Sequence, residues 1–199
     1  TCEYTIFHCK IVFKTNLKQE MEDKMAVQQL HHVAYRCKDA KETADFYVNL
    51  LGLEYYAAVS EETVPSTGEK CPYMHIFFAM KDGSCVAFFE VPGSPPAIED
   101  VNTPSWVQHL ALVVEDEEEQ LEKKEALQAA GVEVIGPTDH GFCKSIYFHD
   151  PNGHRLELTV RTETPEMMEK LRSSSEAMLD EWTKTKTVQN HASWVHEGN

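Results

Sequence analysis

An internal repeat restricts the fold of this chain more than any other feature of its sequence. The segment from His32 to Asp39 aligns with the segment from His109 to Asp116, because each begins with His and reaches Asp seven residues later. Apolar residues at helical spacing follow each segment, and each such run ends at a glycine. Glycine is a common helix stop because it accepts the left-handed backbone. Since a repeat usually marks one supersecondary unit used more than once, we predict two equivalent halves.

Each half continues with short apolar stretches that read as strands. A strand is predicted directly after each helix, at 53–55 and 132–134. Further strands flank a turn in each half, at 74–80 and 85–91 in the first and at 145–148 and 155–160 in the second. The turns contain Asp-Gly and Pro-Asn-Gly, which are strong hairpin signals. Each half is therefore predicted to be strand, helix and about three strands, an α+β module.

These patterns predict one central domain with additions at both ends. We expect an N-terminal extension (1–26), a domain (27–161) made of module one (28–93), a linker (94–106) and module two (107–161), then a C-terminal helix (162–186) and a tail (187–199). The helix is predicted to start at Thr164-Pro165, since proline is tolerated in the first helical turn. We assign no function to the extension. The segments 57–72 and 92–106 are expected to be loops that form substrate-facing walls.

Composition excludes several classes of partner. The 199 residues carry a net charge of −15, and such a field repels nucleic acid and anionic membrane surfaces. No apolar run approaches the roughly 18 residues that a membrane-spanning helix needs. The six cysteines form no CxxC pair and do not predict a disulfide framework. We therefore expect a protein of the reducing cytoplasm, without nucleic acid or membrane partners.

Histidine and glutamate recur at matching places in the two halves. His32 and His109 open the two repeat segments, while Glu90 and Glu157 lie among apolar residues in the last strand of each half. A carboxylate there is costly unless it binds a cation. If the halves pair about a pseudo-two-fold axis, two imidazoles and one or two carboxylates converge. This donor set predicts a divalent metal site suited to Fe(II), Mn, Zn, Ni or Co.

These residues resemble the vicinal oxygen chelate superfamily, which includes glyoxalase I, bleomycin resistance proteins and extradiol ring-cleaving dioxygenases. The resemblance covers about residues 28–161 and rests on His32, Leu51-Gly52-Leu53, Glu90, His109 and the ending Asp150-Pro-Asn-Gly-His-Arg-Leu-Glu157. It implies a pair of βαβββ modules that form an open, cupped mixed sheet around the metal. Because members of the superfamily often dimerise, it also implies a homodimer.

Within the superfamily, the chain is most similar to an Fe(II) extradiol-type dioxygenase that combines O2 with a small catecholic or vicinally oxygenated substrate. The resemblance implies that the metal ligands are His32, His109 and Glu157. His75 then resembles the acid/base residue beside bound oxygen, and Tyr147 resembles the tyrosine that hydrogen-bonds a substrate oxygen. His140 is a possible counterpart of a further loop histidine.

Two alternatives remain open at this point. One is a glyoxalase I-type lyase or isomerase that uses Zn, Ni or Co, with Glu90 as fourth ligand and base. Arg36 matches a glutathione-contacting arginine in that reading, but the asparagine expected shortly after Glu90 is missing. The other is a metal-free protein that sequesters a small molecule such as an antibiotic. Of the other histidines, we expect His31 to point away from the metal, and His149 and His154 to face solvent.

Overall fold

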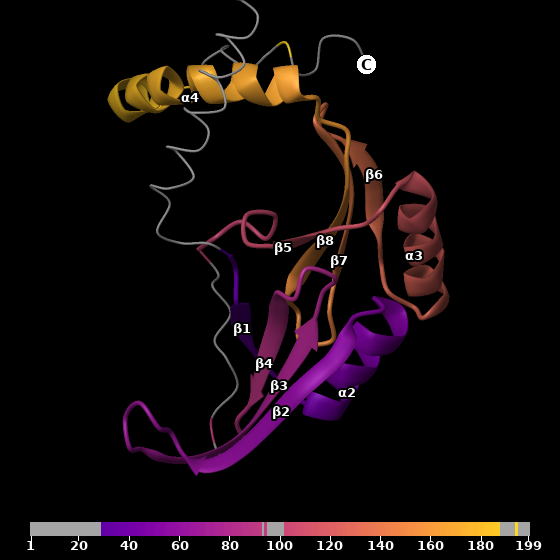
Figure 1. Cartoon of the computed structure of the whole chain (residues 1–199), viewed down its shortest axis with the longest axis vertical. Helices are drawn as coiled ribbons and strands as arrows, with labels where there is room; N and C mark the ends of the chain where they lie inside the picture. The colour runs from indigo at the N-terminus through magenta and orange to yellow at the C-terminus, as the bar shows by residue number, and fades with distance from the viewer. Residues whose placement is uncertain (1–28, 93, 95–101, 188–193, 195–199) are drawn as a thin grey trace, which may run out of the picture.

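The computed structural model describes residues 29–92, 94, 102–187 and 194, and it contains two successive modules followed by a long helix (Figure 1). The first module comprises β1 (His32–Cys37), α2 (Ala40–Asp45), the π-helical turn η1 (Phe46–Leu50), β2 (Glu54–Thr63), β3 (Lys70–Ala79) and β4 (Cys85–Glu90). The second comprises β5 (Leu110–Val113), α3 (Glu117–Ala129), β6 (Ile135–Asp139), β7 (Cys143–His149) and β8 (Arg155–Arg161), and α4 (Pro165–Thr185) follows. The predicted α+β fold of paired βαβββ modules with a C-terminal helix is confirmed.

The two modules have the same sheet topology. The strand order is β1-β4-β3-β2 in the first sheet and β5-β8-β7-β6 in the second. The first strand of each module runs parallel to the last strand, and the other neighbours are antiparallel. Figure 1 shows α2 and α3 on the same side of the two sheets. The opposite faces of the sheets are therefore available to build a site.

The aspartate that closes each repeat segment in the sequence is a helix cap. The carboxylates of Asp39 and Asp116 accept hydrogen bonds from the backbone N–H three residues later, at 2.7 and 2.9 Å. Such a cap satisfies one of the N–H groups that a helix start leaves unpaired. Gly52 and Gly131 follow the helical segments with φ of 79° and 83°. The spacing from Asp to Gly in the repeat thus marks the start and end of the helix.

A continuous core joins the modules. The ring of Tyr47 is fully buried and stacks on Phe78 with centroids 5.3 Å apart. Phe46 contacts Phe148 of the second module at a centroid distance of 6.3 Å. The Tyr47 hydroxyl also donates a hydrogen bond to Oδ2 of Asp150 at 3.2 Å. The first helical segment therefore packs against the β7–β8 turn and positions one module on the other.

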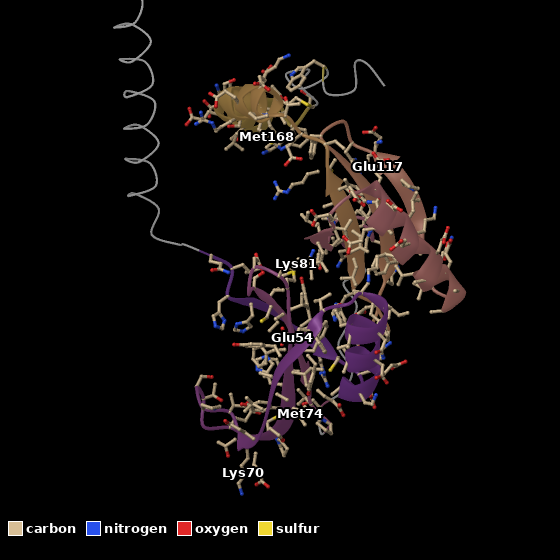
Figure 2. The ribbon with its side chains drawn as sticks, turned by 45° about the vertical axis from the view of Figure 1, so that its right-hand side comes forward. Glu54, Lys70, Met74, Lys81, Glu117 and Met168 are labelled. Atoms are coloured by element: carbon tan, nitrogen blue, oxygen red, sulfur yellow. The ribbon has the colours of Figure 1, made fainter. Side chains whose placement is uncertain are left out.

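The hairpin of β2 and β3 is longer than the sequence predicts. Residues 57–72 were expected to form a loop, yet β2 extends to Thr63 and β3 begins at Lys70. Nearly every residue of β2 is exposed, so its sequence lacks the apolar alternation that indicates a strand. Figure 2 shows Lys70 at one end of the molecule and Met168, on α4, near the other.

Several other boundaries differ from or lie outside the predictions. The strand predicted at 132–134 is wrong, because β6 begins only at Ile135. The C-terminal helix does start as predicted, with Thr164 as its cap and Pro165 in the first turn. The predicted extension (1–26), part of the linker and most of the tail lie outside the described residues. No helix among the described residues has both the length and the hydropathy to cross a membrane.

Candidate functional site

The second module brings two of the predicted metal ligands together. Glu157 pairs with Ala111 in the register of β5 and β8, so residues of odd number on both strands share a face. His109 directly precedes β5, and its Nε2 lies 3.0 Å from Oε2 of Glu157. The glutamate is only 6% exposed. An exposed imidazole thus meets a buried carboxylate.

The hydrogen bonding of His109 prepares Nε2 to bind a cation. Nδ1 lies 3.0 Å from the carbonyl oxygen of Val107, and a carbonyl only accepts, so Nδ1 carries the proton. In the neutral ring, Nε2 then presents a lone pair to the carboxylate of Glu157, and either a proton or a metal ion between these two atoms is needed to make their approach favourable. Two donors that each lie about 2.1 Å from one metal ion at a right angle are about 3.0 Å apart. The observed pair fits a metal ion.

Tyr147 links this pair to a third side chain. Its hydroxyl lies 3.3 Å from Oε1 of Glu157 and 2.7 Å from Nε2 of His140. The loop after β6 carries His140, and Tyr147 pairs with Glu157 in the β7–β8 register. Burial raises the pKa of Tyr147, and the charge of Glu157 raises it further. The hydroxyl therefore stays protonated at neutral pH and can donate a hydrogen bond.

The first module holds a second group of histidines on one face of its sheet. The rings of His32 and His75 have centroids 6.0 Å apart. His75 stacks on Phe89 at 3.6 Å, and its Nε2 is buried with no hydrogen-bond partner among the described residues. Burial lowers the pKa of His75, and His32 lowers it further. The ring is therefore neutral at neutral pH and has one nitrogen available.

The described chain does not bring these two groups together. Within the described residues, no three His, Cys, Asp or Glu side chains lie close enough to hold a metal ion. His32 therefore does not join His109 and Glu157 in this arrangement. The candidate site consists of two halves: His32 with His75 on the first module, and His109, Glu157, Tyr147 and His140 on the second.

Glu90 is not equivalent to Glu157, which corrects the prediction from the repeat. In the parallel pair of β1 and β4, His32 lies opposite Cys85, so the residue that matches Glu157 is Ala87. Glu90 lies further along β4, opposite Met74, and therefore on the other face of the sheet from His32. Its Oε2 accepts a hydrogen bond of 2.6 Å from the backbone N–H of Ala40. The Glu90 carboxylate therefore caps the start of α2, on the face of the sheet opposite to that of His32.

Three residues near the site are placed differently from their predictions or were not predicted. Nδ1 of His31 lies 2.7 Å from Nδ1 of His32, because His31 precedes the strand and strand parity does not apply to it. The ring of His154 contacts that of Tyr35 at a centroid distance of 4.7 Å and is half-buried, whereas His149 is exposed as expected. Arg155 was missed, although its position two residues before Glu157 puts it on the same face.

A family comparison agrees with this architecture. Residues 29–158 match the model of the Glyoxalase/Bleomycin resistance protein/Dioxygenase superfamily. The chain belongs to this superfamily. Among curated proteins, it is similar to biphenyl-2,3-diol 1,2-dioxygenase 2 from Rhodococcus globerulus, with 32% identity over 69 residues, which are 34% of this chain and 36% of that protein. The match therefore spans about a third of the length of that relative.

Solved structures of the superfamily share the fold. A glyoxalase family protein from Enterococcus faecalis is 26% identical with a TM-score of 0.51, over 68% of this chain and 99% of that chain. The fosfomycin resistance protein FosX from Listeria monocytogenes, in complex with Mn(II) and sulfate, is 24% identical with a TM-score of 0.50, over 70% and 96%. A superfamily domain from Frankia sp. has a TM-score of 0.57 at 18% identity, over 69% and 95%.

Proposed function

We propose that this protein is a metal-dependent enzyme of the superfamily, an Fe(II) extradiol-type dioxygenase that cleaves a small catecholic or vicinally oxygenated substrate with O2. The observation that carries the proposal is the Tyr147 hydroxyl, which lies within hydrogen-bond distance of both His140 and Glu157, beside His109. The 32% identity to a biphenyl-2,3-diol dioxygenase over 69 residues supports the same reaction class.

The metal ion would be held by His32, His109 and Glu157. Fe(II) is favoured by the reaction, and the same imidazole and carboxylate donors also accept Zn, Ni, Co or Mn. When bound, the metal would supply a common binding position for O2 and for two neighbouring substrate oxygens. Both atoms of O2 would end in the ring-opened product, so the reaction needs no external reductant.

The chain's own residues would orient the substrate and move protons. Tyr147, whose pKa is raised by partial burial and by the charge of Glu157, would donate a hydrogen bond to a substrate oxygen. His75 would hold or deliver a proton at Nε2, the atom without a partner in the described chain. The aromatic rings around His75, at 3.6 Å from Phe89 and 4.1 Å from Phe77, would exclude water from that proton transfer.

We further propose that the enzyme is a homodimer in which each site combines two chains. Each half of the site is preassembled, but the halves are separate within the described chain. His32 is exposed, and its Nε2 is available when Nδ1 bonds to His31. A second copy that placed its first module over the second module of this chain would supply His32 and His75 together. Two-fold symmetry would make two equivalent sites.

The glyoxalase-type alternative receives less support from the geometry. It requires Glu90 as ligand and base, and the Glu90 carboxylate bonds to Ala40 on the other face of the sheet. The third possibility, a metal-free protein that binds a small molecule, is tested by the same experiment.

The deciding experiment is O2 uptake after anaerobic reconstitution with Fe(II), using a panel of substituted catechols. We expect uptake that depends on Fe(II), together with a coloured ring-opened product from at least one catechol. A chain that binds one metal ion but consumes no O2 with any catechol would contradict the dioxygenase. Tight binding of a substrate by metal-free protein, without turnover, would favour the binding-protein alternative.

A further inference from the structure

A cavity of about 770 Å³ opens beside His109, and its charge differs from that of the rest of the chain. It lies between the segment 103–108 and the start of β8, with Tyr35 of the first module on one side. None of its lining residues is Asp or Glu, while His109, His149, His154 and Arg155 all line it. In a chain with 33 acidic residues and a net charge of −15, an acid-free cavity with a permanent cation is an exception.

The other large cavity provides a comparison. It measures about 790 Å³, and its lining combines three cations with four carboxylates, those of Glu54, Asp82, Glu115 and Glu119. Of these two cavities among the described residues, only the one beside His109 has a lining without carboxylates. The net negative charge of the chain repels a negatively charged ligand, whereas the lining of this cavity attracts it.

Arg155 supplies the permanent charge and is held in a defined orientation. Its Cζ lies 4.5 Å from the centroid of the Tyr147 ring, and Nη1 donates a weak hydrogen bond of 3.4 Å to the carbonyl oxygen of Ser105. Among the described residues, its other N–H groups have no partner. A guanidinium that stacks on an aromatic ring keeps its planar donor edge free, and this edge matches a carboxylate or phosphate group.

The position of Arg155 ties the cavity to the candidate metal site. The β5–β8 register pairs Leu110 with Leu156, so His109, one residue earlier, lies beside Arg155 on the same face as Glu157. A ligand that reached the pair of His109 and Glu157 with one end could thus contact Arg155 with the other. Tyr35 and His154, whose rings lie 4.7 Å apart and are tilted by 35°, also line the cavity and offer aromatic surface to a substrate ring.

We propose that this cavity binds an oxyanion of the substrate, a carboxylate or a phosphate group, with Arg155 as the residue that determines specificity. The part of the inference that assigns the anion to the substrate rests on the proposed function; anion binding itself does not. The substrate class becomes a vicinally oxygenated compound that carries a negative charge, such as a carboxylated catechol, in place of a neutral catechol.

Binding can be measured on the metal-free protein with inorganic phosphate and with benzoate as separate probes, by calorimetric titration. We expect at least one probe to bind with a dissociation constant of about 1 mM, as suits a single anion contact. Arg155→Gln should weaken binding at least about ten-fold, and Arg155→Lys should weaken it less, since lysine keeps the charge but not the planar fork. Preference for benzoate or for phosphate identifies the anion.

Arg161→Gln is the matched control, because Arg161 lies on the same strand but forms an ion pair of 2.8 Å with Glu163. It should bind the probes as the unmodified chain does. Three outcomes would overturn the anion site. The Arg155→Gln variant could bind the probes as tightly as the unmodified chain, both variants could lose the same amount of affinity, or the unmodified chain could bind neither probe.

A turnover assay separates this inference from the proposed function. With the Fe(II)-loaded enzyme, Arg155→Gln should raise KM for 2,3-dihydroxybenzoate at least about ten-fold and leave KM for unsubstituted catechol unchanged. Equal changes in both KM values would contradict the assignment of the anion to the substrate. If no catechol reacts but phosphate or benzoate still binds in a way that depends on Arg155, the proposed dioxygenase is refuted and the anion site is retained.

Discussion

Nε2 of His109 lies 3.0 Å from Oε2 of Glu157, and the strand register explains why only the second module has such a pair. In both modules the first strand runs parallel to the last strand. The histidine at the start of the first strand has a register partner on the last strand, and the residue two positions after that partner lies on the same face of the sheet, diagonally opposite the histidine. That residue is Glu157 in the second module and Ala87 in the first. The repeat therefore preserves the scaffold of the site while the carboxylate is present only once.

Glu157→Gln should remove the metal with little change of the fold. The substitution keeps the size of the side chain but replaces a carboxylate oxygen beside His109 by an amide, which is a poor ligand for a divalent ion. We expect at least a ten-fold loss of Fe(II) affinity, measured by metal analysis after dialysis against a chelator. Glu90→Gln is the control, since Glu90 bonds to the N–H of Ala40. A loss of metal in Glu90→Gln would revive the four-ligand site.

Mixing two inactive variants tests whether each site combines two chains. His32→Ala and Glu157→Ala should each be inactive as a homodimer. In an equal mixture after exchange of subunits, about half of the dimers are mixed and have one intact site of two, so about a quarter of the activity should return. No recovery, despite light scattering that shows exchange into dimers, would instead mean that both residues act within one chain.

Tyr147→Phe should slow turnover and spare the metal. The change removes only the hydroxyl that lies 3.3 Å from Glu157 and 2.7 Å from His140. Loss of one hydrogen bond in the transition state corresponds to about 1.4 kcal/mol, or about ten-fold in kcat. Steady-state kinetics at constant Fe(II) content provides the measurement. An unchanged kcat would remove Tyr147 from the mechanism.

His75→Phe should reduce kcat more strongly, because it removes a proton-transfer group. Phenylalanine preserves the stack on Phe89 but has no ring nitrogen. A general acid or base typically contributes about 100-fold or more, so we expect a fall of that size while Fe(II) content stays constant. Phe77→Leu, a change of a neighbouring ring without proton chemistry, is the control. Full activity of His75→Phe would disprove the acid/base role.

The sequence predicts the modules better than it predicts the site. The segments from His32 to Asp39 and from His109 to Asp116 reveal the repeat, since caps and helix stops act locally and leave local signals. The register between β1 and β4 is a long-range property. Without it, Glu90 looked equivalent to Glu157, although the turn glycines already align Ala87 with Glu157.

Contacts between modules are also invisible in the sequence pattern. His154 lies in a polar turn and was expected to face solvent, but its Nε2 donates a hydrogen bond of 2.9 Å to the carbonyl oxygen of Arg36 in the first module. Strand parity could have identified Arg155, because it shares a face with Glu157. Nothing local indicates that Tyr147 would stack beneath its guanidinium.

Tyr47→Phe tests the contact that positions the modules. The hydroxyl of Tyr47 donates to Asp150 at 3.2 Å, and Asp150 keeps backbone donors from Asn152 and His154 at 2.9 and 2.8 Å after the change. One lost hydrogen bond should lower the free energy of unfolding by about 1 kcal/mol at pH 7, measured by urea denaturation. Tyr35→Phe should change the free energy of unfolding little, because the Tyr35 hydroxyl has no hydrogen bond within the described residues.

The pH dependence gives this prediction a sign. Burial raises the pKa of Tyr47 above its ordinary value, and Asp150 raises it further. Above pH of about 10, the unfolded chain releases the Tyr47 proton while the folded chain keeps it. The stability of the unmodified chain should therefore fall as the pH rises through that range, and the difference from Tyr47→Phe should shrink. A difference that stays constant up to pH of about 11 would mean that the Tyr47 hydroxyl is not buried in the folded protein.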